Sequence, residues 1–374
     1  MKDEKSYKVT PWEVEGEVDY NKLIEEFGTQ PLTDEILEKI EKITGELHIF
    51  LRRKIFFSHR DFDWILNLYR KEPFALYTGR GPTGPVHLGH LMPWIFCKYL
   101  QDKFGCNFYF QITDDEKFML HRKFNPEDTK KIAYDNILDI IAVGFDPKKT
   151  FIFLDTEYAK TLYGLAIRVA KRVTFSTVKA VFGFGNSTNI GMIFFPAIQA
   201  VPCFLPTELE KRKVPILIPA AIDQDPYWRV SRDVAEKLGY YKPAAIHNIF
   251  LPSLTGPSGK MSASIEETAI FCTDAPRQVE KKIKNAFTGG RESEKLQREL
   301  GGDPDVCTVY QYLMFLFEED DEELEKQYLS CKNGELLCGE HKDYLIEKVK
   351  RFLKIHQERR ERALSKLENF MLRD

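Results

Sequence analysis

Short apolar runs alternate with longer amphipathic stretches from Pro73 onward. Five of the runs have the length and the β-branched or aromatic character of buried strands, and apolar residues at helical spacing lie between them. The predicted strands are Phe74–Thr78, Asn107–Thr113, Thr150–Leu154, Val214–Pro219 and Ala244–Ile249. The predicted helices are Leu88–Phe104, Asp128–Val143, Glu157–Lys171 and Gln224–Leu238. This alternation predicts an α/β fold, with a parallel sheet covered by helices on both faces.

The regions on either side of this alternating segment have a different pattern. Residues 1–72 read as an N-terminal extension, in which Leu32–Leu51 has helical spacing and Gly45 is a plausible stop. After about residue 273 the strand pattern ends, so residues 274–374 are predicted to be a separate all-helical domain and residues 73–273 the α/β domain. The predicted helices of the C-terminal domain are Pro276–Phe287, Val309–Phe317 and His341–Leu372. The acidic run Glu318–Glu323, which lies between the last two, is expected to be a solvated face.

The composition is that of a soluble globular protein. Of the 374 residues 43% are hydrophobic and 30% are charged, and the net charge of −3 excludes a general nucleic-acid coat protein. The charged start of the chain, Met1–Lys5, leads into no apolar signal core. The most apolar stretch, Ile190–Leu205, contains two prolines and is too short to span a bilayer. We therefore expect a cytoplasmic protein with no membrane partner.

The cysteines show no pattern of a disulfide framework or a metal site. There are seven, which are scattered along the chain without a Cys-x-x-Cys pair, so the sequence predicts reduced thiols and no protein-held metal. They are Cys97, Cys106, Cys203, Cys272, Cys307, Cys331 and Cys338.

The segment from Tyr77 to His90 has a pattern that suits phosphate binding. A predicted strand ends in a turn rich in glycine and proline, and a helix begins near Leu88. Backbone N–H groups and the positive end of the helix then lie beside the turn, where they can bind phosphate together with Arg80. Histidines three residues apart at a helix start can both donate to phosphate oxygens. The sequence therefore predicts an ATP site with Gly81, His87, Gly89 and His90, the last glycine leaving room for a flat base.

A second loop follows the last predicted strand. Ser253–Ser264 contains two glycines and a proline and is expected to be flexible. Its ammonium and hydroxyl groups are the donors that a leaving pyrophosphate needs as its charge grows. Lys260 supplies the ammonium, Ser262 and Ser264 supply the hydroxyls, and the backbone around Met261 supplies further donors.

The two segments together resemble the paired signatures of class I aminoacyl-tRNA synthetases. The first reads Pro-x-x-x-x-His-x-Gly-His with its proline at Pro82, and the second reads Lys-Met-Ser-x-Ser. This resemblance implies a Rossmann-like catalytic domain and ATP with Mg²⁺ as the nucleotide, with His87, His90, Arg80 and Lys260 in catalysis. The usual second signature has a lysine where this chain has Ala263, so Lys117 or Arg80 is expected to share the work of Lys260. That alanine, and a likeness that runs from about Tyr20 onward, resemble the tryptophanyl enzymes of eukaryotes and archaea.

The expected substrate is tryptophan, and tyrosine is the alternative. An indole offers only an N–H donor, so its pocket needs an acceptor such as the Tyr77 hydroxyl or the Gln111 carboxamide. The resemblance implies that these two residues bind the indole and that Glu116, Gln199 and Gln224 bind the polar end of the amino acid. The Asp-x-His-Ala segment common in tyrosyl enzymes is missing after the second predicted strand. Asp223 and Asp225 are interpreted as helix caps rather than metal ligands.

The resemblance also implies tRNA(Trp) as a partner, a homodimer, and anticodon recognition by the C-terminal helices. The candidate contacts to the anticodon bases are Arg291, Tyr310, Tyr312, Arg359, Arg360 and Arg362. The competing function is that of a nucleotidyltransferase acting without tRNA, which would explain the histidine motif but not the helical domain.

Overall fold

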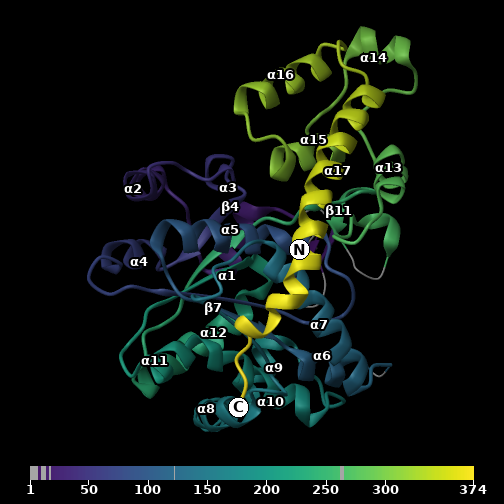
Figure 1. The fold of residues 1–374 in the computed structure, drawn as a ribbon. Coiled ribbons are helices and arrows are strands. Elements are labelled where there is room, and N and C mark those ends of the chain that lie inside the picture. The colour runs from purple at the N-terminus through teal and green to yellow at the C-terminus, as the bar shows by residue number, and fades with distance from the viewer. Residues whose placement is uncertain (1–6, 10–13, 17, 122, 262–264) are drawn as a thin grey trace.

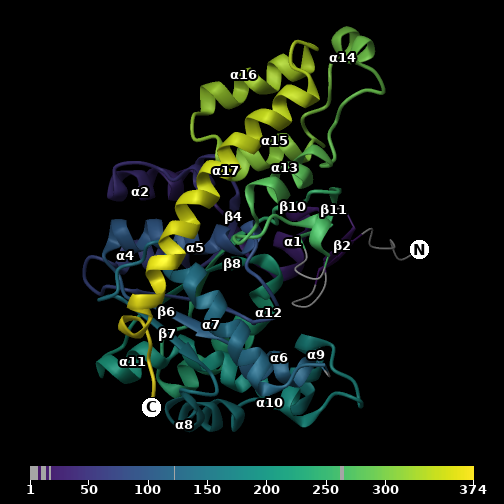
Figure 2. The ribbon, with the colours of Figure 1, turned by 45° about the vertical axis from the view of Figure 1, so that its right-hand side comes forward.

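The main sheet lies at the centre of the protein, with helices on both faces and a lobe of helices at one end (Figures 1 and 2). The structure, a computed structural model, describes residues 7–9, 14–16, 18–121, 123–261 and 265–374. Within these residues the sheet has seven strands in the order β3-β4-β9-β8-β5-β6-β7. Their bounds are β3 Gln30–Pro31, β4 Phe56–Arg60, β5 Ala75–Arg80, β6 Phe108–Ile112, β7 Thr150–Leu154, β8 Ile216–Ala221 and β9 Ala244–Asn248.

The direction of the strands places a ligand site beside β5. Strands β9, β8, β5, β6 and β7 are parallel, as the alternation of strands and helices predicted. The chain moves outward from β5 through β6 to β7 and then returns to β8 on the other side of β5. The strand order therefore switches between β5 and β8. In open sheets of this kind, ligands bind beyond the carboxyl ends of the strands at such a switch.

Alternate side chains of the strands enter two hydrophobic cores. Leu76 of β5 packs into the core under α5 and α7, while Tyr77 packs into the core under α8, α10 and α12. The helices of this part of the chain are α5 Leu88–Phe104, α6 Asp114–Leu120, α7 Pro126–Ala142, α8 Ala159–Ala170, α9 Phe175–Phe182, α10 Ile190–Ala200, α11 Leu205–Glu210 and α12 Asp225–Ala235. No helix among the described residues is long and apolar enough to cross a membrane.

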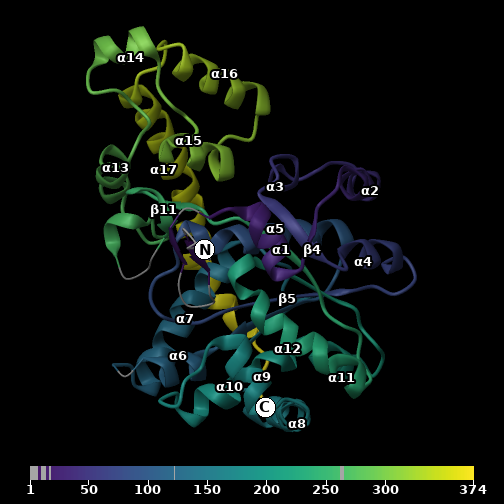
Figure 3. The same ribbon diagram turned by 180° about the vertical axis from the view of Figure 1, so that it is seen from behind.

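The N-terminal extension contributes two strands to the main sheet. β4 pairs with β9 and β3 pairs with β4, both antiparallel, so the sheet is mixed rather than wholly parallel (Figure 3). Gly45, the predicted stop, takes a left-handed conformation and ends the first of two helices within the predicted helical stretch Leu32–Leu51. The remaining elements here are β1 Tyr7–Val9, β2 Val14–Gly16, α1 Tyr20–Phe27, α2 Asp34–Thr44, α3 Ile49–Arg52 and α4 Phe62–Leu68.

The C-terminal region is helical, as predicted, but its helices are more numerous. They are α13 Pro276–Lys284, α14 Glu294–Leu300, α15 Thr308–Tyr312 with its π-helical continuation Leu313–Phe317, α16 Asp321–Lys332 and α17 Cys338–Ala363, which a 3₁₀ segment Leu364–Asn369 follows. The long helix α17 runs from the helical lobe down to α7 (Figures 1 and 2). It therefore joins the lobe to the sheet-containing body.

The acidic run after α15 is largely exposed, as the sequence predicted, but some of its side chains also make specific contacts. Asp320 caps α16 by accepting from the backbone N–H groups of residues 322 and 323. Asp321 binds Arg52 at 2.8 Å and Arg53 at 2.6 Å, and so ties the helical region to the N-terminal extension. Glu318 is buried and accepts from Lys348 at 2.7 Å.

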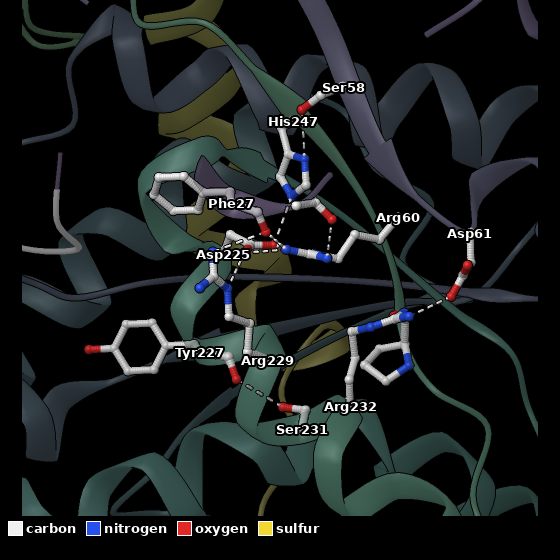
Figure 4. A network of polar contacts seen from close by, with 12 residues as sticks. Phe27, Ser58, Arg60, Asp61, Asp225, Tyr227, Arg229, Ser231, Arg232 and His247 are labelled. Carbon is white, nitrogen blue, oxygen red and sulfur yellow. Dashed lines mark hydrogen bonds and ion pairs between the residues drawn. The ribbon is translucent and has the colours of Figure 1, made fainter. Parts of the chain in front are cut away.

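A buried carboxylate connects β4, β9 and α12 (Figure 4). Asp225 is fully buried in the first turn of α12. The cap position of this helix, which the sequence analysis assigned to Asp225, is occupied by Gln224. Arg60 donates to its two oxygens at 2.6 and 2.8 Å, Arg229 donates at 2.9 Å, and His247 Nε2 lies 3.5 Å away. Burial alone would raise the pKa of this carboxyl, but Arg60 and His247 hold it below its usual range. The helix-cap interpretation of Asp225 was therefore wrong: the residue is the centre of an ion-pair network.

Replacing Arg60 with methionine should destabilise the fold, because it removes two charged donors from a carboxylate that stays buried. We expect a loss of about 3 kcal/mol in the free energy of unfolding. Denaturant titration of the full chain measures it. The control is Lys42→Met, whose ion pair with Glu38 is 78% and 67% exposed and which should change stability by less than about 0.5 kcal/mol.

The Arg60–Asp225 ion pair also determines how the stability of the fold changes with pH. Since the folded pKa of Asp225 is depressed, its contribution is present above the unfolded value of about 3.9 and is lost as the pH falls through the lower folded value. An Arg60→Met protein as stable as Lys42→Met at pH 7 would contradict the assignment.

Candidate active site at the switch between β5 and β8

The turn between β5 and α5 brings two histidines face to face. His87 is the cap residue of α5, and its backbone N–H donates to His90 Nδ1 at 3.1 Å. The two rings stack with their centroids 3.5 Å apart. His87 is buried and His90 is partly exposed. The structure therefore places both predicted histidines on one side of a helix start, as the three-residue spacing implied.

The chain just after the second loop lies against the first turn through backbone pairing. The N–H of Leu88 donates to Ile270 O at 3.1 Å, and the N–H of Cys272 donates to Val86 O at 2.9 Å. At Gly89 an added Cβ would lie 3.2 Å from the His87 ring and 3.4 Å from Met261 Sδ. The two glycine-rich segments, far apart in the sequence, therefore meet beside the start of α5.

The second loop is more regular than the sequence suggested. Its glycines and proline form part of an antiparallel hairpin of β10 Pro252–Ser253 and β11 Gly256–Lys260 rather than an open flexible loop. The side chain of Lys260 lies outside what the structure describes, and Ser262, Ala263 and Ser264 lie outside the described residues. Met261 is buried.

Arg80 braces the first turn from within. Its guanidinium is buried, with Nε donating to Asn136 Oδ1 at 2.6 Å and Nη2 donating to the backbone carbonyl of Gly84 at 3.0 Å. Burial lowers the pKa of Arg80 to about 10, while Asp139 opposes this shift. These contacts give Arg80 a role in shaping the turn.

A chain of buried hydrogen bonds crosses the face of the sheet beyond β5 and β6. Gln199 Nε2 donates to the Tyr77 hydroxyl at 3.0 Å, and that hydroxyl donates to Gln111 Oε1 at 2.5 Å. Gln111 Nε2 then donates to both oxygens of Asp155 at 2.9 and 3.0 Å. Burial, reinforced by Asp115, raises the pKa of the Asp155 carboxyl well above its usual range. Because Asp155 fixes the amide nitrogen, the oxygen of Gln111 faces Tyr77.

A second polar group surrounds Glu116 in the first turn of α6. The carboxylate accepts from Thr113 Oγ1 at 2.9 Å, binds Lys117 Nζ at 2.8 Å and accepts from the Tyr227 hydroxyl at 3.3 Å. Lys117 crosses directly over Gly81, where an added Cβ would lie 1.8 Å from its Cε. The predicted turn glycine and the predicted pocket glutamate are therefore linked by one lysine.

The sequence missed three residues of this site. They are Asp155, which follows β7, Thr113, which follows β6, and Tyr227, which lies in the first turn of α12. Their only local signal is a position just beyond the carboxyl end of a strand, which many loop residues share. Gln224, which the sequence did select, lies at the end of the 3₁₀ turn Ile222–Gln224 after β8, three residues before Tyr227.

The residues expected to read anticodon bases are spread over different places. Tyr312 is fully buried and its hydroxyl donates to Pro252 O at 3.2 Å, so it cannot contact a base. Arg360 binds Asp139 at 3.2 Å beside α7, and Arg359 lies near Gly144, at the end of α17 away from the helical lobe. Arg362 belongs to the same turn of α17. The expectation for Tyr312 was therefore wrong, and the length of α17 places Arg359, Arg360 and Arg362 beside α7 rather than in the helical lobe.

The site combines donors for phosphate with buried acceptors at the end of a parallel sheet. Such an arrangement can hold a nucleotide on the turn before α5 and a substrate with an N–H donor beside Tyr77 and Gln111. The turn and the pocket beside Tyr77 and Gln111 both lie at the carboxyl end of β5, near the switch in strand order, so the two ligands would be neighbours.

Comparison with known proteins agrees with this geometry. Residues 69–354 match the family model of class I tRNA synthetases for W and Y. The chain is 60% identical to a tryptophan–tRNA ligase of Pyrococcus abyssi over 367 residues, which cover 97% of this chain and 94% of the relative.

Solved structures give the same result. A tryptophanyl-tRNA synthetase from Giardia lamblia superposes with a TM-score of 0.89 at 40% identity, covering 95% of this chain and 96% of that one. One from Encephalitozoon cuniculi, bound to tryptophan, superposes with a TM-score of 0.85 at 35% identity, covering 95% and 100%. The class predicted from the two loops is confirmed: the chain belongs to the class I aminoacyl-tRNA synthetases, in the family of the tryptophan and tyrosine enzymes.

Proposed function

We propose that this chain is a tryptophan–tRNA ligase. It activates L-tryptophan with ATP to tryptophanyl-adenylate, releases pyrophosphate, and transfers the tryptophanyl group to the terminal adenosine of tRNA(Trp). The observation that carries the choice of tryptophan is the buried hydrogen-bond chain from Gln199 through Tyr77 to Gln111. The relatives named above carry the same activity in their names, which supports the proposal.

The indole N–H would donate to the Tyr77 hydroxyl and the Gln111 carboxamide oxygen. Both groups are fully buried, and the hydrogen bond between them at 2.5 Å fixes where their remaining acceptor positions lie, so the pocket favours a substrate that brings an N–H donor. Glu116, Gln199 and Gln224 would bind the polar end of the amino acid. Gln199 Oε1 supports this role, because it is buried and has no hydrogen-bond partner among the described residues.

In the activation step, a carboxylate oxygen of tryptophan attacks the α-phosphorus of ATP, and the bond to the bridging oxygen of pyrophosphate breaks. His87 and His90 would donate to the phosphates at the start of α5, where Gly81 and Gly89 let the nucleotide approach the backbone. Lys260, Met261, Ser262 and Ser264 would hold the leaving pyrophosphate, and Mg²⁺ would arrive on ATP.

Two cations have distinct parts in this step. Arg80 would position the turn rather than contact phosphate, because its donors are engaged within the turn and on α7. Lys117 would supply part of the charge that the lysine missing at Ala263 supplies in other enzymes of the class. Its position over Gly81 supports that role.

Transfer to tRNA requires a partner surface and a second subunit in our proposal. Residues 274–374 would bind the anticodon, with Arg291 as an exposed candidate in the helical lobe. A homodimer is supported by exposed apolar side chains on three successive helices, α8 to α10. They are Tyr163, Ile167, Phe175 and Ile190. Free cysteines throughout the described chain support a cytoplasmic location.

ATP–pyrophosphate exchange, measured with each amino acid in turn, tests the proposal. We expect exchange with tryptophan alone, because the acceptors beside Tyr77 and Gln111 match an indole N–H. Exchange supported by tyrosine but not by tryptophan would show that the substrate is tyrosine. Absence of exchange with every amino acid would favour a nucleotidyltransferase that acts on another acceptor.

Tyr77→Phe should raise the tryptophan KM in this assay by about tenfold to a hundredfold, because one buried hydrogen bond to the substrate is lost. The KM for ATP should change little. Tyr99→Phe is the matched control, since Tyr99 lies on α5 outside the pocket and its hydroxyl donates to Thr44 Oγ1 and Glu46 O. An unchanged tryptophan KM in Tyr77→Phe would remove this tyrosine from the site.

Gly89→Ala should raise the KM for ATP about tenfold, because its Cβ presses on the His87 ring and reduces the room for a base. Gly339→Ala is a close control: Gly339 is also the second residue of its helix, and a Cβ there meets nothing within 4 Å. Both alanines favour the helix by about 0.5–1 kcal/mol, so a loss of ATP affinity without a loss of stability identifies the site. Equal KM values in the two variants would argue against an adenine at Gly89.

A further inference from the structure

Asp155 is a buried carboxyl that reaches the proposed indole site through Gln111. Its backbone N–H donates to Ile112 O at 3.1 Å, so the pairing of β7 with β6 continues one residue beyond β7. Gln111 lies opposite Phe153, two residues before Asp155, and side chains two residues apart on a strand point to the same face. Asp155 is 4% exposed, and both of its oxygens accept from Gln111 Nε2, at 2.9 and 3.0 Å. The sheet itself therefore sets this carboxyl against the amide.

The hydrogen bonds that end at Asp155 all run in one direction. Gln199 Nε2 donates to the Tyr77 hydroxyl, which donates to Gln111 Oε1. The amide nitrogen of Gln111 then donates to Asp155. The hydroxyl and the amide could each take the opposite role, because both carry a donor and an acceptor. Reversal would turn the oxygen of Gln111 toward the two oxygens of Asp155, which offer it no donor. The carboxyl at this end is therefore what fixes the direction of the chain.

The proton of Asp155 does not interfere with this bond, because it is directed at Asp115. Burial, reinforced by the charge of Asp115, raises the pKa of Asp155 well above its usual range, which favours the neutral acid. The hydrogen bond between the two carboxyls raises the pKa of Asp155 further and opposes the rise in the pKa of Asp115 that burial causes. These opposite signs are those of a donor at Asp155 and an acceptor at Asp115. The side of Asp155 that faces Gln111 therefore still accepts only.

The direction of the chain decides what Gln111 offers to a substrate. Its carboxamide oxygen is fully buried and has two lone pairs, of which the Tyr77 hydroxyl uses one. A ring N–H can use the other. If the amide were turned, the ring N–H would meet a second N–H and would lose its hydrogen bond inside a buried site, which is costly. An isosteric ring with sulfur in place of the N–H gains nothing from the oxygen in either orientation.

We propose that Asp155 is a positioning residue that gives this site its preference for an aromatic amino acid whose ring carries an N–H donor. It holds the nitrogen of Gln111 and thereby keeps an acceptor, rather than a donor, directed at the substrate. The inference rests on the proposed function, since it takes Tyr77 and Gln111 as the groups that meet the indole. Asp155 acts on the ring only through Gln111, so it affects discrimination between substrates more than the chemical step.

Two amino acids in the ATP–pyrophosphate exchange assay measure this preference. They are L-tryptophan and L-β-(benzothiophen-3-yl)alanine, in which sulfur replaces the indole N–H, and the quantity compared is the ratio of their kcat/KM values. The wild-type protein should prefer tryptophan by at least about a hundredfold. In Asp155→Ala the preference should fall at least about tenfold, because a water that takes the place of the carboxyl can donate or accept and leaves the amide free to turn.

The other outcomes separate this inference from the proposed function. A role in folding alone would lower both kcat/KM values together, and an unchanged ratio in Asp155→Ala would overturn the inference while the proposed function stands. A wild-type protein without the preference would overturn the assignment of Tyr77 and Gln111 to the indole, and the role of Asp155 with it.

Asp114→Ala is the matched control. Asp114 is also a buried carboxyl at this edge of the sheet, but its Oδ1 accepts from the backbone N–H of Thr156, at 3.2 Å, rather than from Gln111. Its ratio should equal that of the wild type, even where both kcat/KM values are lower. An equal fall of the ratio in Asp114→Ala and Asp155→Ala would assign the effect to the loss of any buried carboxyl and would contradict the specific role.

Exchanging the two groups tests the same bond without emptying the site, and decides the matter where Asp155→Ala does not fold. Gln111→Glu alone sets carboxyls against each other and should lose the preference for tryptophan. Adding Asp155→Asn supplies an amide donor to one oxygen of the new carboxylate and leaves its other oxygen to accept from the ring. The preference should then recover at least about tenfold. A double variant that discriminates no better than Gln111→Glu would count against Asp155 as the orienting group.

Discussion

The parallel pairing of β5 with β6 on one side and β8 on the other is the constraint on which the site depends. The register places Gly79 opposite Gln111 and Leu76 opposite Leu217. Because side chains alternate between the faces of a sheet, this register sends Tyr77 and Gln111 to the same face, where α10 supplies Gln199. A shift of one residue would turn Gln111 into the opposite core. The position of the proposed substrate site therefore follows from the register of three strands.

Two further connections hold the site together, and both are made by polar groups that burial isolates from water. Backbone pairing of Val86 and Leu88 with Cys272 and Ile270 joins the chain that follows the second loop to the first turn. The Arg60–Asp225 ion pair joins the N-terminal extension to the helix that carries Tyr227. A buried charge without its partner is costly, so the extension is part of the catalytic body rather than an appendage. Asp321 also ties the helical region to Arg52 and Arg53, but its side chain is 49% exposed, so water weakens that ion pair.

The sequence was sufficient for the residues whose role depends on local chain geometry. A glycine-rich turn between a strand and a helix has one main use for its N–H groups, so the turn with His87 and His90 could be identified from its spacing. The parallel strands were also readable, because strands buried on both faces are apolar throughout. Asp155 and Arg60 have no such signal, because their partners lie 44 and 165 residues away. The antiparallel β4 was hidden for the same reason, since its partner β9 is distant in the chain.

By itself the sequence determined the parallel strands, the helices between them, the two glycine-rich segments and the class of enzyme, because periodicity, turn chemistry and motif spacing are properties of neighbouring residues. Tertiary structure alone decided what those residues face. It turned Arg80 inward to brace the turn, placed Lys117 over Gly81, and buried Tyr312. It also placed Asp155, beyond the end of β7, against the amide of Gln111. Contacts of this kind depend on how separate helices and strands pack, and packing is set by the whole chain rather than by any one segment.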